Sequence, residues 1–180
     1  VLSASEDDHT VAWYENDGSE NFTTHKITTT AKGAYSVYVA DVDGDGEMDV
    51  LSASWRDDTV TWYENDGSES FTAHPITTTA DRAVSVHAVD VDGDGDMDVL
   101  LASEGDGTIA WYENDGSENF TKHPITTSAD YPMSVYAADM DLDGDMDVLS
   151  ALHLDNTIAW YENDGSENFT AHPITTSADG

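Results

Sequence analysis

The heptapeptide WYENDGS at residues 62–68 decides the fold, because the chain contains it four times at a constant spacing of 49 residues. The four copies begin at Trp13, Trp62, Trp111 and Trp160. The pattern HxIT follows each copy at a fixed offset, at His25, His74, His123 and His172. Repeats of roughly 40 to 50 residues are typical of β-propeller blades or of stacked helical pairs. The chain is therefore predicted to be an array of four similar units.

The local pattern within each unit favours strands over helices. Short runs rich in β-branched and aromatic residues alternate with clusters of Asp and Gly, as strands and turns do. In the second unit these runs are SVYVAD (36–41), DVLSAS (49–54), TVTWYEN (59–65) and FTAHPITT (71–78). Proline recurs in the fourth run, where it is typical of an edge strand. Each complete unit is predicted to be a sheet of four antiparallel strands.

The pattern inside the third run indicates how the sheets pack. Apolar or aromatic side chains fall on both faces of TVTWYEN, as expected when neighbouring sheets cover both faces. An all-β propeller satisfies this pattern. A linear stack of sheets is the alternative, but it would leave two large end faces that need polar caps. The repeated tryptophans are expected between blades, and the repeated histidines at the outer edge.

We expect one repeat domain over residues 1–180, with blades at 1–30, 31–79, 80–128 and 129–180. Val1 aligns with Val50, inside a second strand, so the first blade is expected to lack its innermost strand. Propeller rings usually contain about four to eight blades. The chain is therefore expected to be part of a larger ring, or to be completed by another chain or by self-association.

Composition limits the classes of partner. The chain has 38 acidic and five basic residues, a formal charge of -33, and no cysteine. Such acidity argues against nucleic acids and anionic membrane surfaces as partners. Apolar residues make up 38% of the chain, enough for a folded core. No apolar run approaches the roughly 18 residues of a membrane span, so membrane insertion is not expected.

Three acidic segments suggest a metal. They read DVDGDGEMD (41–49), DVDGDGDMD (90–98) and DMDLDGDMD (139–147), with oxygen donors at positions 1, 3, 5 and 9 and glycine at position 6. Ca²⁺ takes roughly six to eight oxygen ligands, which alternate residues of a tightly coiled loop supply. An EF-hand would need Glu at position 12, where this chain has Ser or Leu. Mg²⁺ fits less well because it retains its waters. The spacing predicts three calcium loops.

These loops, with the WYEN and HxI segments, resemble the FG-GAP or VCBS repeat family, which includes the propellers of integrin alpha chains and some fungal lectins. All three loops match the family pattern DxDxDGxxD. The resemblance implies one Ca²⁺ between strands one and two of each blade that has a loop. The implied side-chain ligands are Asp41, Asp43, Asp45, Asp49, Asp90, Asp92, Asp94, Asp98, Asp139, Asp141, Asp143 and Asp147. Position 7 is implied to contribute only its main-chain carbonyl, at Glu47, Asp96 and Asp145. Leu142 replaces the glycine found in the other two loops and is expected to strain the third loop slightly.

The loops at the other end of each sheet differ most among the copies. We call this end the variable-loop face; it comprises residues 5–9 and 32–35 and their equivalents. Exposed aromatics beside arginine are typical of binding hot spots, although loops also diverge without a function. The predicted ligand-binding residues on this face are Lys32, Tyr35, Trp55, Arg56, Arg82, Tyr131 and His153.

The sequence argues against an enzyme. Its units are nearly identical and no nucleophile stands beside a base, whereas catalysis needs a convergent constellation. Calcium sites of modest affinity fill reliably where calcium is millimolar, which predicts an extracellular or cell-surface location. The resemblance to lectin and integrin propellers implies a binding or adhesion module for a carbohydrate or a cell-surface protein. The alternatives are a structural repeat module of a large secreted or surface protein, and an accessory domain of a polysaccharide-degrading enzyme.

Overall fold

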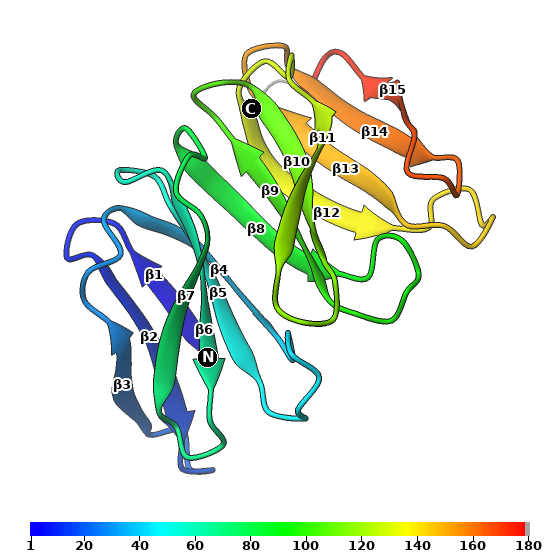
Figure 1. Cartoon of the computed structure of the whole chain (residues 1–180). Helices are drawn as coiled ribbons and strands as arrows, with labels where there is room; N and C mark the ends of the chain where they lie inside the picture. The colour runs from blue at the N-terminus through cyan, green and yellow to red at the C-terminus, as the bar shows by residue number, and fades with distance from the viewer. Residues whose placement is uncertain (179–180) are drawn as a thin grey trace.

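A computed structural model describes residues 1–178, which form 15 antiparallel strands in four sheets (Figure 1). The first sheet contains β1 (Leu2–Ser5), β2 (Thr10–Asn16) and β3 (Phe22–Thr28). The second contains β4 (Ala34–Ala40), β5 (Asp49–Ser54), β6 (Thr59–Asn65) and β7 (Phe71–Thr77). The third contains β8 (Ala83–Val89), β9 (Asp98–Ser103), β10 (Thr108–Asn114) and β11 (Phe120–Thr126). The fourth contains β12 (Pro132–Ala138), β13 (Asp147–Leu152), β14 (Thr157–Asn163) and β15 (Phe169–Thr175).

The sheets stand side by side like the blades of a propeller. Their innermost strands β4, β8 and β12 contact one another in turn, and β1 contacts β4. The first and fourth sheets lie at opposite ends of this arc, and residues 1–178 do not close a ring (Figure 1). The predicted all-β architecture is confirmed, including the three-stranded first sheet. The predicted domain and blade boundaries stay predictions, and the last two residues of the fourth predicted blade lie outside the described range.

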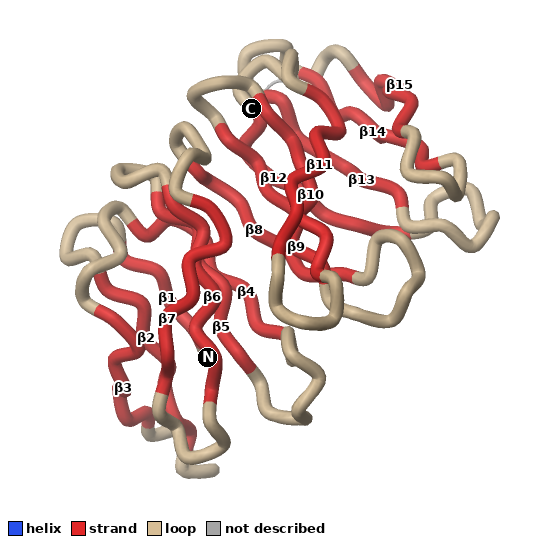
Figure 2. The backbone as a smooth tube through the Cα atoms, viewed as in Figure 1, coloured by secondary structure: helices blue, strands red, loops and turns tan. Residues whose placement is uncertain are grey.

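The tube view shows only strands and loops in the described residues (Figure 2). That part of the chain has no helix that could span a membrane.

The hydrophobic core lies in layers between the sheets. Val50 and Tyr63 pack with Val11 of the first sheet, whereas the adjacent residues Leu51 and Trp62 pack in a cluster with the third sheet. This alternation explains why the strand sequences are apolar on both faces, since each inner sheet has a neighbour on either side. The repeated tryptophans of the two inner sheets are fully buried, at Trp62 and Trp111. Those of the end sheets, Trp13 and Trp160, are half-buried.

Each outermost strand has a β-bulge at the same place. In the second sheet Val60 pairs with Thr77, but the next residue of β6 pairs with Pro75, so one residue of β7 bulges out. Proline is tolerated there because the strand is at an edge and the ladder is already interrupted. The His74 ring packs at a tilt against the Trp62 ring, with centroids 4.7 Å apart, and its Nε2 lies 2.7 Å from Glu64 Oε2. The repeated histidines thus lie at the outer edge, half-exposed, as expected.

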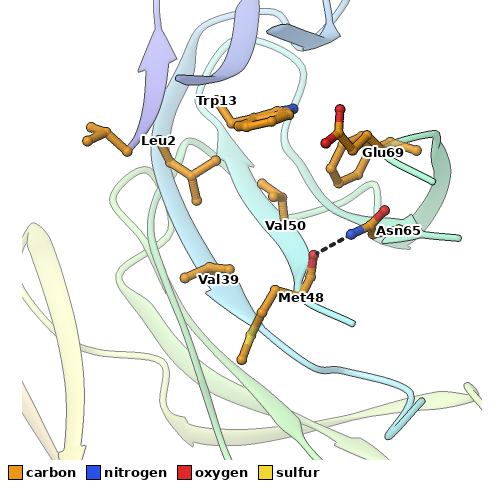
Figure 3. Close-up of a pocket in the computed structure, with 9 residues that line it drawn as sticks. Leu2, Trp13, Val39, Met48, Val50, Asn65 and Glu69 are labelled. Atoms are coloured by element: carbon orange, nitrogen blue, oxygen red, sulfur yellow. Dashed lines mark hydrogen bonds between the residues drawn. The ribbon is translucent and has the colours of Figure 1, made fainter. Parts of the chain in front are cut away.

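A hollow of about 370 Å³ lies where the first sheet meets the second (Figure 3). Its walls are mainly apolar, with Leu2 and Trp13 on one side and Val39 and Met48 on the other. The Asn65 amide donates a hydrogen bond of 3.2 Å to the Met48 carbonyl at its rim. At the other two junctions the innermost strands contact each other, β4 with β8 and β8 with β12. The first sheet has only three strands and has none equivalent to these, and the hollow lies at its junction with the second sheet.

Candidate metal centres and ligand faces

The three acidic segments form the hairpin loops that join β4 to β5, β8 to β9 and β12 to β13. Aspartate side chains coil each loop by accepting hydrogen bonds from backbone N–H groups two residues ahead. In the first loop Asp43 Oδ1 accepts from the Asp45 N–H at 3.1 Å, and Asp45 Oδ1 accepts from the Glu47 N–H at 2.8 Å. The coil brings alternate carboxylates together, because side chains two apart point to one side of the bend.

In each loop, three of the carboxylates bring one oxygen atom each close together. These oxygens lie within 4.8 Å of one another in each of three clusters: Asp41, Asp43 and Asp45; Asp90, Asp92 and Asp94; and Asp139, Asp141 and Asp147. The predicted ligands at positions 1 and 3 are thus brought together in every loop. Position 5 joins the cluster in the first two loops, and position 9 joins it in the third.

The chemistry of the clusters fits a hard divalent cation. Asp41 Oδ1 is buried and has no hydrogen-bond partner among the described residues, although such groups are normally paired. Burial, followed by the negative charges of Asp49, Asp45 and Asp41, raises the pKa of Asp43. Burial likewise raises the pKa of Asp92, with Asp94 and Asp90 adding to the effect. A cation bound by these oxygens would offset this repulsion and satisfy the orphaned atom, and oxygen-only donors suit Ca²⁺.

Position 9 has a second task that the spacing did not predict. Asp98 is fully buried as the first residue of β9, and its two oxygens accept backbone N–H groups from Val91 at 2.9 Å and Asn114 at 2.8 Å. Burial raises the pKa of Asp98 to about 7. Asp49 and Asp147 make the equivalent bonds. A carboxylate offers about four acceptor sites, so these bonds leave lone pairs for an ion; ligation by position 9 stays a prediction.

Position 7 points toward the NDGS turn of the same sheet. A Cβ on Gly116 would lie 2.5 Å from Asp96 Oδ2, and one on Gly165 would lie 2.5 Å from Asp145 Oδ2. Glu47 lies similarly against Gly67. These contacts place the side chains beside the neighbouring turn, so the main-chain carbonyl is the group that position 7 would offer to an ion.

Leu142, which replaces a glycine in the third loop, has the strained backbone conformation that was predicted. Leu142 has φ of +67° and is 86% exposed. The equivalent glycines, Gly44 and Gly93, have φ of +75° and +79° and open space around the missing Cβ. Leucine is therefore strained by its backbone conformation and not by a clash.

The asparagine that ends each of the last three WYEN motifs anchors the acidic loop of its sheet. Asn114 Nδ2 donates to the Met97 carbonyl at 3.3 Å in its own sheet and to the Val42 carbonyl at 3.2 Å in the loop of the second sheet. Asn65 and Asn163 make the equivalent bond within their sheets. Sequence reasoning missed this role; the signal was an invariant Asn at the end of a strand in all four copies.

On the variable-loop face, the structure brings together Trp55, Arg56 and Arg82. The two guanidinium carbons lie 5.9 and 5.6 Å from the centroid of the Trp55 ring, which is within cation–π range. Arg56 Nη2 is 2.9 Å from Glu6 Oε1, and Arg82 Nη1 is 3.5 Å from Glu104 Oε1. Lys32 adjoins this group because its carbonyl accepts the Arg56 N–H at 3.1 Å.

The other three predicted residues of this face belong to the second and fourth sheets. The Tyr131 carbonyl accepts the His153 N–H at 2.9 Å, which joins these two residues at the fourth sheet. Tyr35 was expected in a loop, but it lies inside β4, where the register skips it at a bulge. The bulge turns a residue of the strand outward, and Tyr35 is 47% exposed.

A row of rings on the innermost strands was also missed. Tyr38 of β4, His87 of β8 and Tyr136 of β12 occupy the same repeat position, with ring centroids 4.5 Å and 4.8 Å apart along the row. Burial lowers the pKa of His87, so its imidazole is neutral near pH 7. The signal was a ring-bearing residue at every copy of this position, hidden because the residue type changes.

The family of the chain follows from these repeats. A family profile described as FG-GAP-like repeat matches residues 1–52, 41–101 and 90–150. The chain belongs to the FG-GAP-like repeat family. The second and third matches each begin at the first aspartate of one acidic loop and extend through the next loop. The resemblance read from DxDxDGxxD is thereby confirmed. A search of curated protein sequences found no match.

Solved structures share the arrangement of this FG-GAP-like repeat chain. An Agrocybe aegerita lectin that recognises non-reducing terminal N-acetylglucosamine aligns with a TM-score of 0.59 and 16% identity, over 96% of this chain and 51% of the lectin. A Lactobacillus plantarum protein aligns with a TM-score of 0.67 and 16% identity, over 96% and 51%. A V. cholerae biofilm matrix protein aligns with a TM-score of 0.52 and 21% identity, over 92% and 26%. The chain thus spans about half the length of the first two proteins, and these likenesses show the fold alone.

Proposed function

We propose that this FG-GAP-like repeat chain is a calcium-stabilised binding module that works outside the cell or at its surface. The observation that carries the proposal is the presence of three carboxylate clusters whose oxygens lie within 4.8 Å of one another, at equivalent places in three sheets. Two carboxylates about 5 Å apart repel by roughly 3 kcal/mol at an effective dielectric of 20. Each of the three clusters brings three carboxylates together, and a bound cation best explains this arrangement.

The chain's own residues would hold the ion in a defined way. In the first two loops the side chains at positions 1, 3 and 5 would supply the clustered oxygens, and in the third loop the side chains at positions 1, 3 and 9 would do so. The bound ion would supply only positive charge. The hydrogen bonds that these carboxylates accept from backbone N–H groups keep the loop coiled without the ion. Sites of modest affinity fill where calcium is millimolar, which supports an extracellular location.

The ligand in this proposal is a carbohydrate or a cell-surface protein that meets the variable-loop face. The indole of Trp55 close to two guanidinium groups is the best-defined feature there, and tryptophan and arginine dominate binding hot spots. The lectin among the structural neighbours supports a carbohydrate. We further propose that the module is not an enzyme, because its carboxylates occur in repeated loops instead of one convergent group.

Two measurements test the proposal together. Metal analysis after dialysis against calcium should find about three ions per chain by the loop count above, and a glycan array should show binding with calcium that chelator abolishes. No bound calcium at millimolar concentration would refute the metal sites. Calcium binding without any glycan or protein ligand would instead favour a structural module, which the similarity to a biofilm matrix protein supports. Catalytic sequence beside this segment in its gene would favour an accessory domain of a polysaccharide-degrading enzyme.

A further inference from the structure

The aromatic row on the innermost strands lines a separate cavity of about 470 Å³. Tyr38, His87 and Tyr136 contribute rings from three successive sheets, and Met97 and Met146 add apolar surface. The cavity lies beside the acidic loops, at the opposite end of the sheets from the variable-loop face. It is therefore independent of the ligand surface proposed above.

One polar side chain in this cavity is free to bind a ligand. His87 is 7% exposed and lines the cavity, and its imidazole makes no hydrogen bond within residues 1–178. Its ring nitrogens are not among the buried polar atoms that lack a partner, so they remain accessible from the cavity. A neutral imidazole has one donor and one acceptor, so His87 offers both to a group that enters the cavity. A hydroxyl group can use either.

The negative charge of the cavity decides which ligands with a hydroxyl group can bind there. Asp90, Asp92 and Asp145 line it, and no lysine or arginine does. Even if calcium occupies the β8–β9 loop, the four carboxylates at positions 1, 3, 5 and 9 exceed the charge of the ion. The whole chain adds a field of -33 formal charges. Anionic ligands are therefore repelled, and cations are concentrated near the surface.

Aromatic rings next to carboxylates are well suited to an organic cation. The face of a tyrosine ring attracts an ammonium group, and alkylated ammonium ions also gain from contact with apolar surface. We propose that this cavity binds a small hydroxylated organic cation, with the ammonium group against Tyr136 and the hydroxyl group at His87. Tyr136 is the accessible end of the row, because 58% of its surface is exposed.

Choline is a suitable probe, because a neutral isostere exists in which a tert-butyl group replaces the trimethylammonium group. Both keep the hydroxyl and give one sharp methyl resonance, so NMR titrations with calcium-saturated protein compare them directly. We expect choline to bind about tenfold or more tightly than the isostere, and salt to weaken choline binding. Equal affinities, or no binding of either, would overturn the proposal. So would binding of a neutral methyl glycoside in place of choline.

Matched variants locate the site. Tyr136→Ala should reduce choline affinity about tenfold, whereas Tyr136→Phe should retain it because the ring face is kept. Phe22→Ala removes another exposed aromatic ring outside the cavity and should leave choline binding unchanged. Loss of choline binding in Phe22→Ala, or unchanged choline binding in Tyr136→Ala, would contradict the assignment. These outcomes leave the calcium count and the variable-loop face untouched, so failure here is distinguishable from failure of the proposed function.

Discussion

Replacing Asp92 with Asn isolates the role of one carboxylate in the second acidic loop. The variant keeps the shape of the side chain, and its amide oxygen can still accept the Asp94 N–H that Asp92 Oδ1 accepts at 3.1 Å. It removes one negative charge from a cluster whose oxygens lie within 4.8 Å of one another. Only the capacity to bind a cation is therefore expected to change.

The expected size follows from linkage between binding and folding. A site filled at 100 times its Kd stabilises the folded state by about 2.7 kcal/mol, which corresponds to a Tm difference of about 5 to 10 °C for a chain of this size. Asp92→Asn should lose most of this gain in calcium. In chelator its Tm should be unchanged or slightly higher, because burial and neighbouring charges raise the pKa of Asp92 and thus disfavour the carboxylate.

The assay is thermal unfolding with calcium and with chelator, alongside Asp115→Asn as a matched control. Asp115 also accepts backbone N–H groups in a turn, from Ser117 at 2.9 Å and Asn119 at 3.3 Å, but it lies in an NDGS turn outside the carboxylate clusters. The control should shift Tm equally in both conditions. If Asp92→Asn behaved in the same way, or bound as many calcium ions as the parent, the reasoning would be refuted.

Three further outcomes are expected. In chelator, the free energy of unfolding should fall as pH rises from about 4 to about 7, because burial raises the pKa of Asp98 to about 7 in the folded state. Over this window the folded chain keeps a proton that the unfolded chain loses. With calcium present, the gain in Tm over chelator should increase over the same pH window, as melting curves will show. Leu142→Gly should raise the free energy of unfolding by about 0.5 to 1 kcal/mol in urea titrations, because relief of the positive φ exceeds the entropic cost of glycine. Arg56→Ala should barely change Tm, since its pair with Glu6 is exposed, yet weaken ligand binding on a glycan array; a large loss of Tm would contradict this.

Most of the fold was accessible from sequence because repetition multiplies a weak local signal. The runs at 49–54 and 59–65 match β5 and β6, and the run at 36–41 is displaced from β4 by two residues at its start. Proline at one position of three outer strands marked the edge, and the structure shows a bulge there. The bulge at Tyr35 was not predicted, since register depends on the partner strand and not on the strand itself.

The candidate sites also differ in how far they could be predicted: the sites built from residues close in sequence could be predicted, and the site built from distant residues could not. Donor spacing within nine residues was enough to predict that positions 1 and 3 converge in all three loops, because a coiled loop brings near neighbours together. Of the other two predicted donors, position 5 joins the cluster in two loops and position 9 in one. The row of Tyr38, His87 and Tyr136 was not predicted, because residues 49 apart meet only when three sheets pack with their inner strands in contact. Chemical type varies along the row, so repetition alone did not reveal it.

The double use of position 9 links the loops to the packing of the sheets. Asp98 holds the N–H of Val91 within its loop and that of Asn114 at the end of β10, while the Asn114 side chain reaches the Val42 carbonyl in the loop of the second sheet. A change in the charge of Asp98 therefore acts on its own hairpin and, through Asn114, on the junction with the neighbouring sheet. Because the chain has no disulfide, this polar chain of contacts is a route by which an ion in one loop would stabilise the contact between two blades, and not merely its own bend.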